Sequence, residues 1–143
     1  MTTDPTAFAA LGFFPADHAA AESGKVYASG AYWNTLRFPE FPAVLPSMTL
    51  VAVLRQPFHA ADADHAFAIA LEDADGRRQE FAVDGQFRAA LGEGARLGEE
   101  NIIPITVPVF GLGFEQPGDF SFVLLVDGVE LARYSIHVVR VVG

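Results

Sequence analysis

The sequence predicts an all-β fold, a sandwich or a barrel, from three observations. After Pro117-Gly118-Asp119 the residues alternate in polarity, turn at Asp127-Gly128 and return through Tyr134, which is the pattern of a β-hairpin. Short strand-like segments recur along the whole chain, separated by Gly, Pro and Asp. Hydrophobic residues make up 51% of the chain, 13 residues are Phe and only 19% are charged, so a well-packed core is expected.

The length of 143 residues is typical of one domain. Residues 1–12 are predicted to form a loose N-terminal arm, because too few residues follow Pro5 for a helix that is stable alone. Residues 13–143 are predicted to form the β-domain.

The composition excludes several classes of partner and site. The net charge is −9 with only nine Lys and Arg, which argues against nucleic acid and against anionic membranes. The chain has no cysteine, which excludes disulfides and thiolate chemistry and fits a reducing compartment. The first residues lack the pattern of a signal peptide, and no apolar run has membrane-spanning length. We therefore expect a cytoplasmic protein.

The first half of the chain predicts a hairpin and then a connection between sheets. Side chains alternate on both sides of Glu22-Ser23-Gly24, so we expect a hairpin that turns there rather than a short helix over 17–24. The segment Pro39–Pro46 contains three prolines, so it cannot be a central strand and is predicted to cross between sheets. Met48–Arg55 is apolar on both faces and should be a buried strand.

Two later strands follow from alternation. In His65–Leu71 the bulky residues should face the core, while the alanines face solvent or a close neighbour. Ile103–Val109 carries Pro104 and Pro108 at even spacing, so both prolines can direct their missing N–H groups away from a neighbouring strand. This segment is predicted to be an edge strand protected against further pairing.

The register of the last hairpin favours a three-residue loop, Val126-Asp127-Gly128. A two-residue loop would place Phe122 opposite Arg133, which mixes core and surface residues on one face. The three-residue loop pairs Phe120 with Tyr134 and Phe122 with Ala132. Pairing of Val126 with Val129 would contradict this prediction.

The loop between His59 and His65 is the place where metal-capable side chains gather most closely in the sequence. His59, Asp62, Asp64 and His65 are weak candidates for ligands of a divalent cation. An irregular loop does not make these side chains converge, and acidic residues commonly form solvated turns. We therefore predict no metal site and no cofactor.

Two other segments also have a structural explanation that outweighs the functional one. Glu72-Asp73-Ala74-Asp75-Gly76 resembles the start of a calcium loop, but Arg77 stands where the next ligand should be, so a turn is expected. Tyr27, Tyr32 and Trp33 could form a stacking platform, although such residues usually belong to the core.

The chain resembles a group of short bacterial proteins of unknown function that are predicted to be β-sandwiches. The resemblance covers roughly residues 13–139 and is carried by turn and strand-end motifs. These motifs are Ala16-Asp17-His18-Ala19, Gly24-Lys25-Val26-Tyr27, Gly30-Ala31-Tyr32-Trp33, Pro117-Gly118-Asp119-Phe120 and Val126-Asp127-Gly128. The resemblance implies a small cytosolic immunoglobulin-like antiparallel β-sandwich, and it implies no activity.

The expected function is that of a non-catalytic structural or protein-interaction module, either self-associating or part of a larger assembly. Met48–Arg55 and Phe120–Val126 are apolar on both faces, so a partner is expected to cover the excess. The alternative is a small-molecule or metal-binding protein, or a metal-dependent hydrolase, that uses the His59–His65 loop.

Overall fold

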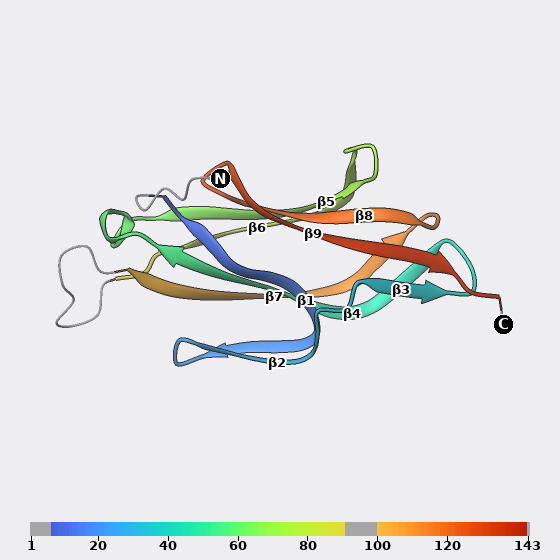
Figure 1. Cartoon of the computed structure of the whole chain (residues 1–143), viewed down its shortest axis with the longest axis horizontal. Coiled ribbons are helices and arrows are strands. Elements are labelled where there is room, and N and C mark those ends of the chain that lie inside the picture. The colour runs from blue at the N-terminus through green and yellow to red at the C-terminus, as the bar shows by residue number, and fades with distance from the viewer. Residues whose placement is uncertain (1–6, 91–99, 143) are drawn as a thin grey trace.

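Two β-sheets pack face to face in this protein, whose structure, a computed structural model, describes residues 7–90 and 100–142 (Figure 1). The strands of sheet A, in spatial order, are β2 (Lys25–Ala31), β1 (Ala9–Glu22), β4 (Ala43–Gln56) and β7 (Asn101–Phe114). Those of sheet B are β3 (Thr35–Phe38), β9 (Val129–Arg140), β8 (Gly118–Val126), β5 (His65–Asp73) and β6 (Arg78–Phe87).

The predicted all-β class is confirmed. Over the described ranges the one helical element is the short 3-10 helix η1 (Phe58–Ala60). No helix in this part of the chain is long and apolar enough to cross a membrane.

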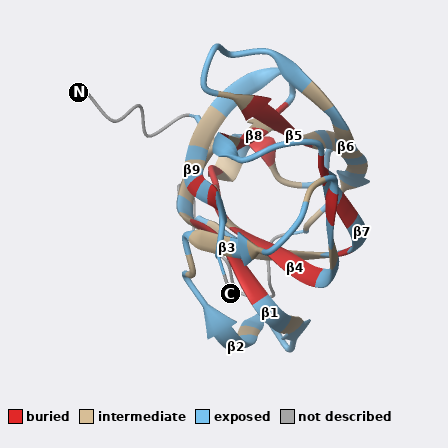
Figure 2. Cartoon of the chain, turned by 90° about the vertical axis from the view of Figure 1, so that its right-hand side faces the viewer, coloured by how far each residue is buried: buried red, intermediate tan, exposed pale blue. Residues whose placement is uncertain are grey.

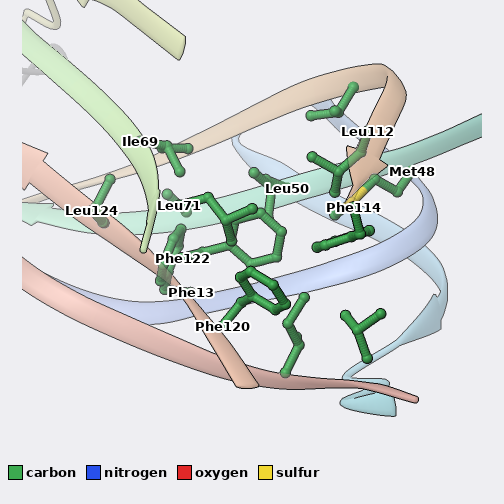
Figure 3. Close-up of a cluster of buried hydrophobic side chains, with 14 of the residues drawn as sticks. Phe13, Met48, Leu50, Ile69, Leu71, Leu112, Phe114, Phe120, Phe122 and Leu124 are labelled. Atoms are coloured by element: carbon green, nitrogen blue, oxygen red, sulfur yellow. The ribbon is translucent and has the colours of Figure 1, made fainter. Parts of the chain in front are cut away.

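The core lies between the two sheets and takes side chains from both (Figures 2 and 3). Phe122 of β8 is fully buried at its centre, and Leu50 of β4 is fully buried on the other sheet. The rings of Phe114 in sheet A and Phe120 in sheet B meet edge to face at 5.1 Å, a favoured geometry for aromatic pairs. Ile69 and Leu71, which the alternation of β5 assigned to the interior, therefore share this core with residues of β4 and β8.

The N-terminal strand begins earlier than the sequence predicted. β1 starts at Ala9, and Ala9 pairs with Arg55 of β4, so residues 9–12 of the predicted arm belong to sheet A. Residues 1–6 lie outside the described part of the chain. A strand pattern as short as Ala9–Gly12 is recognised only when its neighbour, β4, is known.

The hairpin that turns at Ser23-Gly24 is confirmed, with Glu22 paired to Lys25. Ser23 and Gly24 have φ of 51° and 74°, as the tight type I′ turn requires. β1 pairs with β4 up to Ala16 and beyond it only with β2. The far half of this hairpin therefore leaves the sheet, and both views place it on the side of sheet A that faces away from sheet B (Figures 1 and 2).

The proline-rich connection is confirmed as the crossing from sheet B to sheet A, but it is shorter than predicted. β3 ends at Phe38 and β4 already begins at Ala43, so Pro46 lies inside a strand. Pro46 is tolerated there because the ladder between β4 and β7 skips it: Leu45 pairs with Leu112 and Ser47 with Phe110, while Pro46 pairs with no residue of β7. The missing N–H of Pro46 therefore breaks no pair of this ladder.

The predicted edge strand is also confirmed. β7 is the last strand of sheet A and pairs with β4, placing Pro104 opposite Val53 and Pro108 opposite Thr49. The two prolines are four residues apart, so their backbone nitrogens point in the same direction, toward the open edge of the sheet. This removes two of the donors that another strand would use.

The prediction for the last hairpin is wrong. Its loop has two residues, Asp127 and Gly128, and Val126 pairs with Val129. Both loop residues have positive φ, 49° and 80°, which again fits a type I′ turn. A bulge in β9 leaves Leu131 unpaired and shifts the register by one residue. Phe122 is thereby opposite Tyr134 and Phe120 opposite Ile136, so core residues still share one face.

Candidate interaction surface

The structure does not bring the four candidate metal ligands together. His59 is exposed on η1, and the Asp64 carboxylate points to Arg88 at 3.4 Å. Asp62 has a left-handed φ of 60°, and its backbone N–H donates to the carbonyl of Ala89. Within the described ranges, no three His, Cys, Asp or Glu side chains lie close enough to hold a metal ion.

His65 instead connects two turns of the chain. Its Nδ1 lies 2.7 Å from Oδ2 of Asp127, in the β8–β9 turn, and its Nε2 lies 2.7 Å from the carbonyl oxygen of Ala60, in η1. Both partners only accept hydrogen bonds, so both ring nitrogens must donate, which the imidazolium alone can do. Asp127 also accepts a hydrogen bond from the N–H of Ala66 at 2.9 Å. The pair fastens the β8–β9 turn to the start of β5.

The pKa values of the two groups shift in opposite directions. Burial of the His65 ring favours the neutral imidazole, but the bonds to Ala60 and Asp127 and the charges of Asp127 and Asp64 outweigh burial and raise its pKa. The hydrogen bond from Ala66 is the largest influence on Asp127 and, with the bond from His65, lowers the pKa of its carboxyl against the opposing effect of burial. The charged pair is therefore the stable form at mildly acidic pH.

Replacing Asp127 by asparagine is expected to lower the free energy of unfolding by about 1–2 kcal/mol near pH 5.5. Asparagine tolerates the left-handed φ but removes the charge. Because folding raises the pKa of His65, the stability that its charged ring contributes is fully present below about pH 6.5. It is lost as the pH rises through the pKa of His65 in the folded state. Because folding lowers the pKa of Asp127, the stability that its ionised carboxylate contributes is fully present above about pH 4. It is lost as the pH falls through the pKa of Asp127 in the folded state. Urea unfolding near pH 5.5 and near pH 9 measures the difference.

The matched control is Asp119→Asn, because Asp119 and His137 form a pair with the same 2.7 Å separation whose side chains are both largely exposed. An exposed pair contributes little, so the control should change stability by less than about 0.5 kcal/mol. Equal losses in the two variants, or a loss at Asp127 that does not depend on pH, would contradict the structural role of this pair.

Glu72 is a buried carboxylate on β5, 8% exposed, on the face of sheet B that points away from the core. Its oxygens lie 3.0 Å from Nε of Arg78 on β6 and 3.0 Å from Nη1 of Arg133 on β9. Arg133 also forms two hydrogen bonds with Glu130. The apolar stems of these arginines can cover the sheet while their charged groups pair with carboxylates. The arrangement links three strands and brings no nucleophile to a base.

The neighbouring calcium-like segment is a turn, as predicted. One carboxylate oxygen of Asp73 accepts hydrogen bonds from the backbone N–H groups of Asp75 and Arg77, each at 2.9 Å. This is the local bonding by which aspartate forms turns.

The expectation that Tyr27, Tyr32 and Trp33 belong to the core is wrong for the two tyrosines. Trp33 is half-buried against the core, but Tyr27 and Tyr32 are exposed. Tyr32 stacks on Phe14 with ring centroids 4.2 Å apart, whereas Tyr27 lies on the hairpin that leaves the sheet. The aromatic pairs of the described residues do not join Tyr27 to Tyr32, so the three residues do not form one platform.

Two outward valines of the strands that are apolar on both faces are already covered by the chain itself. Val51 and Val123 lie outside the core cluster but are almost fully buried. Val123 is opposite Arg133 on β9, and Val51 points away from the core because its neighbours Leu50 and Ala52 belong to the core cluster. The exposed apolar surface must therefore be sought elsewhere.

A groove of about 580 Å³ lies between the edge strands β6 and β7. Figure 2 shows these two strands on the same side of the molecule. Phe81 and Val83 line it from sheet B, and buried Val109 and Leu112 line it from sheet A. Phe110 also lines the groove, and its ring is 77% exposed. A second hollow of about 500 Å³ lies over the alanine face of β5. We favour the first, because it borders the most exposed aromatic ring of the described residues.

The family model described as "Family of unknown function (DUF6941)" matches residues 11–139. The chain belongs to this family. The match runs from β1 to β9, so it includes both sheets and every strand that lines the groove. A search of the curated proteins found no match for the sequence.

The sequence of this DUF6941 member does not by itself single out Phe110 or the groove. The signal was present at one position: Phe110 continues the outward row of β7 that contains Pro104 and Pro108, and a large ring is unusual on the outward face of an edge strand. The groove itself depends on which two edges lie side by side. That information is in the topology rather than in any single segment.

Proposed function

We propose that the protein is a non-catalytic interaction module that binds another protein through the groove between β6 and β7. The observation that carries the proposal is Phe110, a residue of the groove lining that is 77% exposed. Covering this ring would contribute about 2 kcal/mol to an interface. Exposed aromatic residues beside apolar pockets are the usual anchors of protein interfaces.

The proposal includes an immunoglobulin-like β-sandwich. With β2 and β3 set aside, the strand orders are β1-β4-β7 in one sheet and β9-β8-β5-β6 in the other. In chain order these seven strands correspond to A, B and E against G, F, C and C′ of the immunoglobulin-like topology. This correspondence supports the proposed fold type, in which β6 occupies the position of C′.

The ion pairs of the described residues support a role without catalysis. His65 bridges two turns and Glu72 joins arginines on two other strands, so each of these buried charged groups has a structural task. The absence of cysteine from the sequence supports an intracellular location, which is part of the same proposal.

Native mass spectrometry of the protein, purified gently from its own cells, tests this function. The expected result is a stoichiometric complex, with a foreign subunit or with further copies of the 15.3 kDa chain, that is lost in the Phe110→Ser variant. The control is Val129→Ser, which removes another exposed apolar side chain, at the β8–β9 turn. A complex that survives Phe110→Ser, or a bare monomer in the wild type, would refute the proposal.

A further inference from the structure

The two edge strands beside the groove differ in their ability to pair. β7 is protected by Pro104 and Pro108, whose positions lack donors toward its open edge. β6 runs for ten residues without a proline, and in the described part of the chain it pairs only with β5. The free N–H and C=O groups of β6 therefore form an unprotected template for one more strand.

A strand added to β6 would lie over the groove. Phe81 and Val83 are half-buried on the inward side of β6 and line the groove with Phe110 of the opposite sheet. Side chains alternate between the two faces of a strand. Every second side chain of the added strand would therefore enter the groove beside Phe81 and Val83, and the others would join the outer face of sheet B.

The charges near this edge define the partner further. On the outer face of β6, Glu80 and Asp84 are exposed, and Glu115 lies across the groove. The ion pairs between described residues give none of these three carboxylates a basic partner, and no Lys or Arg of residues 7–90 and 100–142 lines the groove. Opposite charges on neighbouring strands stabilise pairing, and like charges oppose it.

We propose that β6 accepts a β-strand of a partner protein that carries apolar residues on one face and Lys or Arg on the other. The inference rests on the proposed function and specifies how the partner binds. Backbone hydrogen bonds to β6 supply affinity, and the alternating side chains supply specificity. A second copy of this chain fits less well, because each copy carries a net charge of −9 and brings the same carboxylates to the edge.

Synthetic peptides of about eight residues test this mode directly. The first probe alternates Val and Lys, the second alternates Val and Glu, and the third is the Val–Lys peptide with N-methyl groups on alternate backbone nitrogens. We expect the Val–Lys peptide to bind at least about tenfold more tightly than the other two. It should also slow hydrogen exchange at the amides of β6.

Charge-reversal variants make the test specific. Glu80→Lys with Asp84→Lys should weaken binding of the Val–Lys peptide about tenfold and strengthen binding of the Val–Glu peptide. The matched control, Glu22→Lys with Glu40→Lys, makes the same change in net charge at exposed sites away from β6 and should leave binding unchanged apart from a general effect of charge.

Equal binding of all three peptides, exchange protection at another strand, or a dimer that forms through β6 would overturn the inference. These failures are distinguishable from failure of the proposed function. If a Phe110-dependent complex forms without protection of β6, strand addition is wrong and the interaction role stands.

Discussion

The Phe122→Ala variant is expected to lose about 3–5 kcal/mol of unfolding free energy. Phe122 is fully buried. Its ring meets that of Phe81, on β6 of the same sheet, edge to face with the ring centroids 5.9 Å apart. It lies in the cluster shared by both sheets (Figure 3). Truncation removes a large apolar side chain from this cluster and leaves a cavity that rigid strands cannot easily close. The loss is a large part of the total stability of a typical domain.

Urea unfolding and calorimetry measure this loss, with Phe110→Ala as the matched control. The same atoms are removed in both variants, but the Phe110 ring is largely exposed, so the control should change stability by less than about 0.5 kcal/mol. A melting temperature that falls by roughly 10 °C in the first variant alone is expected. Similar small shifts in both variants would mean that Phe122 is not central to the core.

The second large effect is expected when Arg78 and Arg133 are both replaced by alanine. The carboxylate of Glu72 would then remain almost buried with no cation beside it. Removing the partners of a buried charge typically costs about 3 kcal/mol or more, because its desolvation is no longer offset. Each single variant should cost about 1 kcal/mol, since the other arginine remains.

Adding Glu72→Gln to the double variant separates this cause from the loss of packing. The triple variant has no buried charge to compensate, so it should recover most of the lost stability in urea unfolding. Glu72→Gln alone should cost less than the double arginine variant, because both arginines are about half exposed and can be solvated by water. If the triple variant is as unstable as the double one, the loss comes from the arginine stems that cover the sheet.

The parts of the fold that could be predicted from sequence are those fixed by local backbone chemistry. Pro104 and Pro108 identified the edge strand, and the turn at Ser23-Gly24 identified the first hairpin, because proline and left-handed turns restrict the backbone whatever lies around them. Met48–Arg55 could be predicted as a buried strand because it is apolar on both faces.

The failures arose where distant segments decide the outcome. The bulge at Leu131 restores the register that a two-residue turn alone would break, and it is not visible in the turn residues. Tyr27 and Tyr32 are of a residue type that is usually buried, but both are exposed here. Tyr27 lies on the hairpin that leaves the sheet, and Tyr32 lies at its base. The ligand-like residues from His59 to His65 are separated because His65 pairs with Asp127, 62 positions later in the chain.

The candidate interaction surface could not be predicted from sequence for the same reason. Phe81 and Phe110 are 29 positions apart and belong to different sheets, and only the topology makes β6 and β7 neighbouring edges. The sequence predicted an interaction module from apolar residues on both faces of central strands. In the structure Val51 and Val123 of those strands are buried, and the most exposed aromatic residue, Phe110, belongs to an edge strand instead.

Photo-crosslinking in the protein's own cells is the most direct test of the claim that this surface binds a partner. A benzophenone-bearing phenylalanine would replace Phe110 in one variant and Val129, an exposed residue away from the groove, in the other. The account predicts a covalent adduct of one defined mass from position 110 and none of that mass from position 129. No adduct at position 110, or the same adduct from both positions, would contradict it.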